Sequence, residues 1–238
     1  MSDISKDLAR DFIPAQEGGP LRSFGRIKSR ALKPKQQGLF DTLLPKLTID
    51  EALISSLSTR DQVWLEIGFG GGEHMASQAF AHEEVLILGC EPFINGIGSA
   101  LRHIDERQLN NVRIWPNDAR MLLDQMPEAC IERVFILFPD PWPKARHQKR
   151  RLVQDETIKA LARVLKEGGR LRFATDWAHY ADEALARFLD SGLFIWPAER
   201  ASDWSLPPKD HITTRYELKK LGDCAPVFID MIKSTKSA

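Results

Sequence analysis

Cysteine is scarce in this sequence, and spacings typical of metal sites are absent from it. The chain of 238 residues holds three cysteines, which are widely spaced and form no CxxC pair. They are Cys90, Cys130 and Cys224. The six histidines form no HExxH, HxH or mixed Cys/His cluster. We therefore expect reduced thiols, no disulfide scaffold and no metal ion.

Long apolar runs are also missing. No stretch reaches the roughly 18 apolar residues that a membrane-spanning helix needs. The first residues, MSDISKDLARDF, are charged and lack the apolar core of a signal peptide. The sequence therefore predicts a cytoplasmic protein with no membrane partner. Its length and its 43% hydrophobic content suffice for one sizeable α/β domain without a covalent staple.

Net charge is zero, yet the basic residues are clustered. Residues 20–37 contain six basic residues and no acid, and residues 144–152 contain five and no acid. Local potential attracts phosphates whatever the net charge, so both clusters indicate a polyanionic partner, although two solvated loops would have the same composition. Residues 1–37 are polar and basic, and we expect a partly flexible N-terminal extension there, followed by one domain over residues 38–238.

From residue 62 onward, short apolar runs alternate with longer amphipathic segments. The runs predict buried strands at Gln62–Ile67, Val85–Cys90, Val112–Trp115, Arg133–Phe138 and Arg170–Ala174. Helices are expected within Leu47–Leu57 and at Gly72–Ala81, Phe93–Glu106, Ala119–Met126, Lys149–Lys166 and Trp177–Leu189. Such alternation is typical of an α/β fold, with a mainly parallel sheet covered by helices on both faces.

Two further features concern the ends of these elements. Gly168 and Gly169 look like the stop signal of the helix expected at Lys149–Lys166. Three short strand-like segments follow, and we expect them to close the sheet edge with an antiparallel strand. They are Leu193–Trp196, Arg215–Leu221 and Val227–Ile232. Ligands of such folds bind beyond the carboxyl ends of the strands, so the residues there are the candidate site.

A glycine loop follows the first strand. Gly68, Gly70 and Gly72 allow sharp turns and a close backbone approach to a ligand, although a plain structural turn would also use them. The dinucleotide fingerprint GxGxxG fails, because its last position is Glu73. Glu66, just before the loop, would instead face the cationic amino-acid end of S-adenosylmethionine.

Acids also follow the next two strands. Glu91 can accept hydrogen bonds from two ribose hydroxyls. Asn117 and Asp118 lie where an adenine amino group could donate, while Asp118 could equally cap the next helix. Three acids at three consecutive strand ends favour an adenosine pocket over three unrelated caps.

The fourth strand leads into a proline-rich loop, Phe138-Pro-Asp-Pro-Trp-Pro-Lys144. Each proline fixes its own φ and restricts the residue before it, so we expect Phe138, Asp140 and Trp142 to be extended. A stiff loop that presents one acid and one large aromatic suits a reaction that depends on positioning, although Trp142 could simply pack. The basic run begins directly afterwards.

Polar residues continue after the fifth strand. Asp176 could cap the following helix or accept hydrogen bonds from a substrate base. Farther along, the segment Thr213–Glu217 places polar residues where a core strand would have apolar ones.

At this point the sequence resembles the bacterial tRNA (guanine-N7)-methyltransferase family. The matching motifs are LEIGFGGG, GCEP, NDA, FPDPWPKARHQKRR, ATDW and TRYE, spread over residues 22–221. The resemblance implies a class I methyltransferase fold, which is a Rossmann-like, mainly parallel seven-stranded sheet with an antiparallel edge strand. It also implies S-adenosyl-L-methionine as the cofactor and guanosine 46 in the variable loop of tRNA as the target.

The resemblance also assigns residues. Glu66, Glu91, Asp118 and Asp140 match donor-binding positions, and Asp140 matches the proposed catalytic position. The residues that match substrate- or RNA-contacting positions are Lys144, Arg146, Lys149, Arg150, Arg151, Asp176, Thr214, Arg215, Tyr216 and Glu217. From the residues alone we add Gly68, Gly70, Gly72 and Asn117 as donor contacts and Trp142 as a stacking platform for a base.

Guanine N7 carries a lone pair and no proton, so its methylation needs alignment rather than deprotonation. We expect Asp140 to stabilise the cation that forms or to hold the guanine edge. Alternatives are a methyltransferase acting on an amino group of a base or protein, a non-catalytic RNA-binding module, and an NAD-dependent dehydrogenase. We expect a monomer or a weak homodimer.

Overall fold

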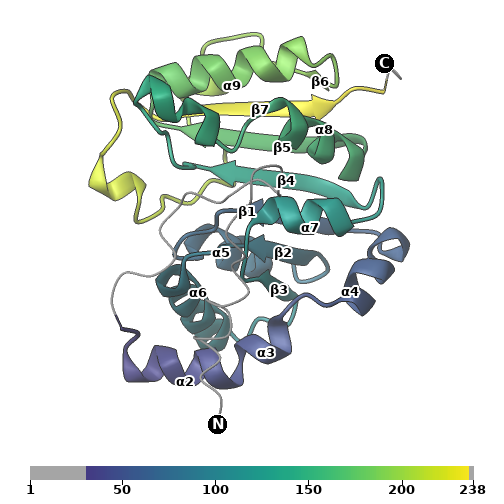
Figure 1. Ribbon diagram of the computed structural model, residues 1–238, viewed down its shortest axis with the longest axis vertical. Coiled ribbons are helices and arrows are strands. Elements are labelled where there is room, and N and C mark those ends of the chain that lie inside the picture. The colour runs from purple at the N-terminus through teal and green to yellow at the C-terminus, as the bar shows by residue number, and fades with distance from the viewer. Residues whose placement is uncertain (1–30, 236–238) are drawn as a thin grey trace.

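Seven strands form one sheet in the computed structural model, which describes residues 31–235 (Figure 1). The strands are β1 (Val63–Ile67), β2 (Leu86–Cys90), β3 (Val112–Trp115), β4 (Ile131–Leu137), β5 (Leu165–Thr175), β6 (Phe194–Ile195) and β7 (Val227–Lys233). Their order is β3-β2-β1-β4-β5-β7-β6. The first five are parallel, and β7 runs antiparallel to β5 and β6. The expected fold class is confirmed.

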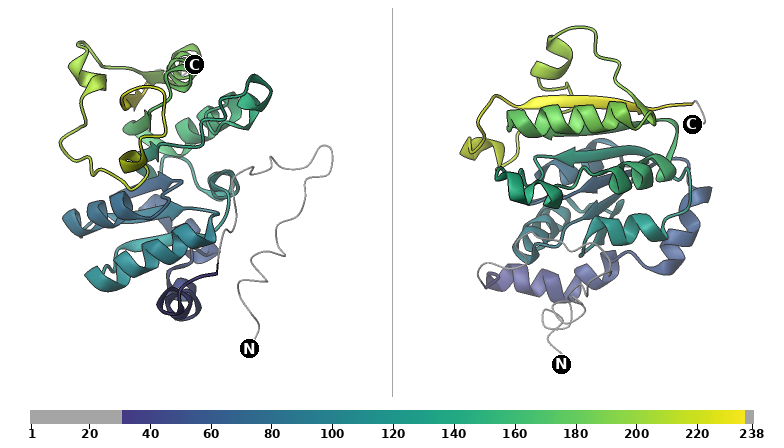
Figure 2. Two further views of the ribbon diagram at one scale, coloured as in Figure 1. Left: turned by 90° about the vertical axis from the view of Figure 1, so that its left-hand side faces the viewer. Right: turned by 45° about the horizontal axis from the view of Figure 1, so that its top comes forward.

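Helices cover both faces of this sheet (Figure 2). One face carries α4 (Glu51–Ser56), α7 (Ala119–Gln125), α8 (Asp155–Val164) and α9 (Ala178–Asp190). The other carries α2 (Pro34–Thr42), α3 (Leu44–Leu47), α5 (Glu73–Ala81) and α6 (Ile94–Arg107). Short helical turns are η1 (Leu57–Thr59), η2 (Ala145–Arg150), α10 (Ser202–Ser205) and η3 (Glu217–Lys219).

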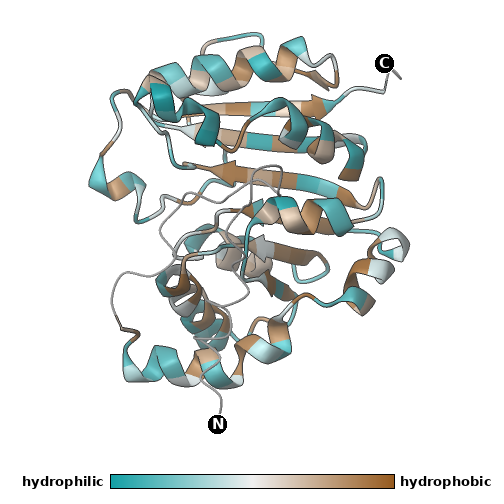
Figure 3. Cartoon of the chain, viewed as in Figure 1, coloured by the Kyte–Doolittle hydropathy of each residue, from teal (hydrophilic) through white to brown (hydrophobic). Residues whose placement is uncertain are grey.

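The core has two halves because strand side chains alternate between the faces. Val63 and Leu65 of β1 pack under α7 and α8, whereas Trp64 packs on the α5 side. Figure 3 shows the apolar colour concentrated along the strands. All three cysteines are free, as expected. Within residues 31–235, no helix is long and apolar enough to cross a membrane.

The N-terminal part of the described chain joins the folded body early. Helix α2 begins at Pro34, buries Phe40 and packs against α6. Residues 34–37 therefore belong to this layer, although we expected them in the basic extension. The rest of that expectation, for residues 1–30, lies outside the described residues.

The helix expected at Lys149–Lys166 is present as α8, but it is shorter than expected, at Asp155–Val164. The chain forms the turn η2, then α8, and β5 already begins at Leu165. Gly168 and Gly169 lie inside β5, where its pairing with β4 shifts register. A Cβ on Gly169 would come within 2.8 Å of the carbonyl oxygen of Lys166. Gly169 therefore permits a close backbone approach and Gly168 supplies a φ of 68° in an irregular strand, and the pair does not end a helix.

The strand expected at Arg215–Leu221 is also wrong, because this segment contains the helical turn η3 instead. Glu217 accepts hydrogen bonds from both the backbone N–H and the hydroxyl of Thr214, at 2.7 and 3.0 Å. These local bonds compete with strand pairing and favour a turn.

Parallel register brings the carboxyl ends of the strands to one edge of the sheet. Ile67 pairs with both Cys90 and Ile136. The antiparallel pair Thr175–Val227 places the segment before β7 beside the end of β5, at the left of Figure 1. Residues from distant parts of the sequence therefore meet at this edge.

Candidate active site at the carboxyl edge of the sheet

The glycine loop after β1 combines open and crowded positions. Gly68, Gly70 and Gly72 all adopt positive φ, at 75°, 54° and 79°. A Cβ on Gly72 would lie 2.5 Å from the Cβ of Ala100 in α6, so this glycine lets α5 approach α6. A Cβ on Gly68 or Gly70 would meet nothing within 4 Å. Packing therefore does not explain these two glycines, and they leave the backbone accessible at the sheet edge.

Glu91 is held by backbone groups on both sides. Its Oε2 accepts from the Gly70 N–H at 2.7 Å, and its Oε1 accepts from the Phe93 N–H at 2.9 Å. The residue is 7% exposed. Burial raises its pKa to about 7 against these two bonds, and the charges of Asp140 and Glu66 add to the rise. The carboxyl group is fixed in place, and no lysine or arginine of residues 31–235 forms an ion pair with it.

Glu66 is 3% exposed and pairs with a residue that the sequence did not single out. Its Oε2 lies 2.6 Å from Nδ1 of His74, on the first turn of α5. Nε2 of His74 lies 3.3 Å from the side-chain amide of Gln78. No spacing rule marks His74, because its partner is set by how α5 packs on β1.

Asp118 both caps α7 and binds Arg120. Its Oδ1 accepts from the backbone N–H and the Nε of Arg120, each at 2.9 Å, and its Oδ2 accepts from Nη2 at 2.6 Å. Asn117 accepts the Asp118 N–H at 2.8 Å. Because a carboxylate offers about four acceptor positions, Oδ2 of Asp118 keeps one for a further donor. The cap and a ligand contact are thus compatible.

The loop after β4 is not extended as expected. Phe138 and Trp142 have positive φ, at 52° and 42°. Prolines fix their own φ, but the sign of φ at the preceding residues is decided here by tertiary contacts, such as the Phe138 N–H to Ala174 carbonyl bond at 2.7 Å. A left-handed conformation costs a non-glycine residue about 1–3 kcal/mol, and such residues cluster at functional sites.

Asp140 and Trp142 lie in this loop. Asp140 is an exposed residue, yet its neighbours withdraw enough solvent from the carboxyl group to raise its pKa. The Arg150 guanidinium lies 5.0 Å from the Trp142 ring centre, and His147 meets the ring edge-on at 5.8 Å. These contacts orient the indole and join the loop to the basic run.

The basic run divides into two parts. Lys144, Arg146 and Lys149 are exposed on η2 and its approach. Arg151 is 2% exposed and turned inward. Three of the cations expected to contact RNA therefore lie on the surface, whereas Arg151 does not.

Asp176, which follows β5, is 4% exposed. The segment that precedes β7 covers it. Its Oδ1 accepts from the Tyr216 hydroxyl at 3.3 Å and its Oδ2 from the Gly222 N–H at 3.0 Å. The first N–H of α9, that of Ala178, donates to Asp223 instead. Asp176 therefore binds this segment and does not cap α9.

The other residues of the TRYE stretch point in different directions. Glu217 closes the turn with Thr214 and pairs with Nε2 of His211 at 2.8 Å. Arg215 donates to Glu73 at 2.6 Å and to Ser99 at 3.0 Å. Only Tyr216, of these residues, hydrogen bonds to an acid of the site.

A partly buried ion network anchors the same segment, and the sequence did not single out its residues. Asp210 accepts from Arg172 at 2.6 Å and from Arg133 at 2.7 Å, and its backbone carbonyl accepts from Gln78 at 2.8 Å. Burial opposes ionisation of Asp210, but the two arginines outweigh it and lower its pKa to about 2. Arg172 also pairs with Asp230 of β7. No motif marks these residues, which lie far apart in the sequence.

The carboxylates at this edge of the sheet lie close enough together to shift the pKa values of their neighbours. Asp140 and Glu66 raise the pKa of Glu91, and Asp176 and Asp140 add to the rise that burial causes in the pKa of Tyr216. Within residues 31–235, no lysine or arginine forms an ion pair with Glu91, Asp140 or Asp176. We call Glu66, Glu91, Asp140 and Asp176 the acidic site. Its excess of negative charge suits a cationic ligand.

Comparisons with known proteins agree with this geometry. The family model described as "Putative methyltransferase" matches residues 60–225. A tRNA (guanine-N(7)-)-methyltransferase of Caulobacter vibrioides is 56% identical over 92% of this chain and 98% of that protein. One from Hyphomonas neptunium is 52% identical over 88% of this chain and 98% of that protein.

A solved structure shares the fold. The 16S rRNA methyltransferase KamB superposes with a TM-score of 0.54 at 15% identity, covering 78% of this chain and 94% of that one. At that identity the likeness shows the fold alone. The family match and the two relatives decide the rest: the chain belongs to the bacterial tRNA (guanine-N7)-methyltransferase family.

Proposed function

We propose that this protein transfers the methyl group of S-adenosylmethionine to N7 of guanosine 46 in the variable loop of tRNA. The acidic site is the observation that supports this proposal best. Within this site, the charges of Asp140 and Glu66 raise the pKa of Glu91. None of its carboxylates forms an ion pair with a lysine or arginine of residues 31–235. The donor carries an ammonium and a sulfonium, and the relatives' names supply the tRNA and the N7 atom.

The acceptor positions left on the carboxylates fit the donor. Each oxygen of Glu91 accepts one backbone N–H, which leaves one position on each for the two ribose hydroxyls. Asp118 and Asn117 would meet the adenine edge, and Glu66 would face the ammonium. Gly68 and Gly70 leave the backbone uncovered, so that a ligand can approach it closely.

The chemistry asked of the protein is alignment and charge stabilisation. N7 attacks the methyl carbon with its own lone pair while the bond from that carbon to sulfur breaks. The guanine becomes cationic and the sulfur neutral, so positive charge moves onto the base. A carboxylate fixed beside the base stabilises that charge in the transition state. Asp140 is our candidate, with Asp176 and Tyr216 holding the base.

RNA binding would use the exposed part of the basic run. Lys144, Arg146 and Lys149 can neutralise phosphates, together with the half-buried Arg150 beside Trp142, which makes binding sensitive to salt. Trp142 is oriented by Arg150 and can stack on a base that has left its tertiary pairing.

The decisive experiment identifies the product. The protein is incubated with methyl-labelled donor and an unmodified tRNA transcript, and the labelled nucleoside is identified after digestion. We expect 7-methylguanosine, and no label when position 46 is replaced by adenosine. A methylated amino group on any base would refute the proposal.

Asp140→Asn tests the residue assigned to catalysis. We expect kcat to fall roughly 100-fold with saturating tRNA and donor, because one preorganised charge is lost from the transition state. The matched control is Asp190→Asn, which removes an exposed acid at the end of α9. Equal kcat in Asp140→Asn and the wild type would remove Asp140 from the mechanism.

A further inference from the structure

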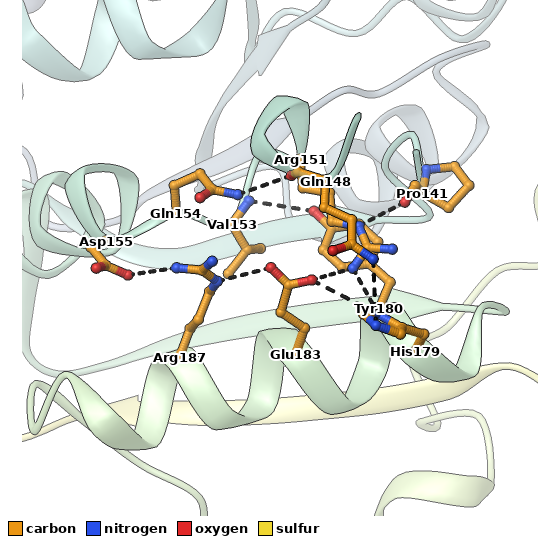
Figure 4. Close-up of polar contacts among 10 residues, drawn as sticks. All are labelled: Pro141, Gln148, Arg151, Val153, Gln154, Asp155, His179, Tyr180, Glu183 and Arg187. Atoms are coloured by element: carbon orange, nitrogen blue, oxygen red, sulfur yellow. Dashed lines mark hydrogen bonds and ion pairs between the residues drawn. The ribbon is translucent and has the colours of Figure 1, made fainter. Parts of the chain in front are cut away.

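Arg151 ends the basic run but points into the protein (Figure 4). Its Nε donates to the carbonyl oxygen of Pro141 at 2.7 Å. Its Nη1 donates to Oε2 of Glu183 and lies 3.1 Å from Nδ1 of His179. The guanidinium also covers the ring of Tyr180, with its carbon 4.6 Å from the ring centre. One side chain thus joins the loop after β4 to helix α9.

This environment separates Arg151 from its neighbours in the run. Arg146 and Lys149 are exposed and can meet a phosphate without breaking any contact. Arg151 would have to leave the half-buried carboxylate of Glu183 and the buried ring of Tyr180 to do so, and Glu183 would lose this partner. Its position indicates an internal contact rather than an RNA contact.

Glu183 is itself held from a second side. Its Oε1 accepts from Nε of Arg187 at 3.0 Å, and Arg187 donates onward to Asp155 at the start of α8 at 2.8 Å. The Tyr180 hydroxyl accepts from the Val153 N–H at 3.3 Å. The chain on both sides of η2 is therefore fastened to one face of α9.

The bond to Pro141 acts on the strained residue of the loop. The carbonyl of Pro141 belongs to the peptide plane from which φ of Trp142 is measured. That φ is 42°, a conformation that persists only where surrounding contacts hold it. Asp140 lies on the other side of Pro141. Fixing this one carbonyl therefore restrains the residues on both sides of it.

We propose that Arg151 is a positioning residue that holds Asp140 and Trp142 in place through Glu183 on α9. The proposal rests on the proposed function, since Asp140 is the residue assigned there to methyl transfer. Lysine cannot replace Arg151, because its single ammonium lacks the planar fork that serves Pro141 and Glu183 at once. The arrangement explains why an arginine is buried at the end of a surface run.

The test compares Arg151→Lys, Glu183→Gln and the double variant. In each we expect kcat at saturating tRNA and donor to fall about tenfold or more. The double variant should be no worse than the poorer single variant, because both remove the same restraint. A fourth variant, Arg151→Gln, removes the charge, and in it the slope of log Kd for tRNA against log salt should stay at the wild-type value, since no phosphate contact is lost.

Two further variants give the comparison. Arg146→Gln removes an exposed cation and should reduce the salt slope by about one. Arg163→Lys disturbs a half-buried arginine of α8 that donates to the carbonyls of Leu123 and Met126, away from the loop. It should leave kcat unchanged. Hydrogen exchange of the Asp140 and Trp142 amides should accelerate in Arg151→Lys and Glu183→Gln and not in Arg163→Lys.

Wild-type kcat and wild-type exchange in Arg151→Lys would overturn the proposal. Arg151→Gln removes the charge, as Arg146→Gln does, and a salt slope reduced by the same amount in Arg151→Gln would also overturn the proposal, because it would make Arg151 an RNA contact. If Arg151→Lys does not fold, Glu183→Gln decides alone, since the amide has the same shape. If the wild-type protein forms no 7-methylguanosine, the proposed function fails, while the exchange data still decide whether Arg151 holds the loop.

Discussion

The two sides of the candidate active site are assembled differently. On the donor side, after β1 and β2, the key contacts join residues at most 21 positions apart: Glu91 with Phe93, Glu91 with Gly70, and Glu66 with His74. On the substrate side, after β4 and β5, the key contacts join residues farther apart in the sequence, as between Asp176 and Tyr216 or between Asp176 and Gly222. The donor side is therefore largely a local property of two loops, whereas the substrate side depends on the tertiary structure.

The largest effect is expected from cutting a long-range contact. Asp210→Ala leaves Arg133 without its carboxylate and releases the segment before β7 from the sheet. We expect the free energy of unfolding to fall by about 3 kcal/mol. We also expect a large loss of tRNA methylation, with donor Kd within about twofold of the wild type. Chemical denaturation and donor titration measure the two sides separately.

The control for this variant is Asp230→Ala, which removes the other partner of Arg172 from β7 without releasing the segment. Acid provides a second check. The pKa of Asp210 is lowered to about 2, so its contribution is complete above about pH 4 and is lost as pH falls through 2. If donor affinity collapsed together with methylation in Asp210→Ala, the two sides would not be separable.

A smaller effect is expected on the donor side from Gly72→Ala. The new methyl group would meet Ala100 at 2.5 Å and sit at a φ of 79°. We expect a loss of about 2–3 kcal/mol in unfolding free energy, from strain and overpacking together. Gly168→Ala is the matched control, because it has a φ of 68° and free space, and should cost only about 1 kcal/mol. Equal losses would show that the contact between α5 and α6 does not matter.

The smallest effect concerns the protonation of Glu91. Its pKa is about 7, and the ionised form accepts ribose hydroxyls better. Donor affinity should therefore rise with pH up to about 7, level off above it, and weaken about tenfold per unit below it. Calorimetry in buffers of different ionisation enthalpy would count the proton released on binding near pH 7. Glu91→Gln should bind the donor about tenfold more weakly and without this pH dependence.

In the ligand-free protein, Glu91 should make the free energy of unfolding fall with rising pH, whereas donor affinity rises. A carboxyl group whose pKa is raised on folding contributes most below its unfolded value of about 4.3, and that contribution falls as pH rises through 7. The difference in unfolding free energy between wild type and Glu91→Gln should therefore shift against the wild type from pH 4 to pH 8. A constant difference would contradict the raised pKa.

The same contrast explains what could be predicted from the sequence. Glycines and acids at strand ends can be recognised in the sequence, because turns and strand ends have local signatures. The positions of Glu66, Glu91 and Asp118 were therefore predicted together with the fold. His74, Arg133 and Asp210 carry no such signature, because their partners are chosen by packing.

Local patterns were also misleading where a tertiary contact overrides them. The glycine pair after α8 looked like a helix stop but lies in β5, where a strand backbone approaches closely. The alternating prolines suggested an extended loop, and tertiary contacts turned Phe138 and Trp142 to positive φ. Arg151 looked like one more surface cation, and only its burial against α9 distinguishes it.

The antiparallel pairing of β7 with β5 has a consequence for biosynthesis. A ribosome makes β5 well before β7, so the nascent chain carries β5 as an exposed sheet edge while the intervening residues emerge. During that interval the glycine loop can already fold around Glu91, whereas Asp176 still lacks Tyr216 and Gly222. The contacts around Glu91 can therefore form before those of Asp176, and β5 is the strand that a chaperone would need to shield.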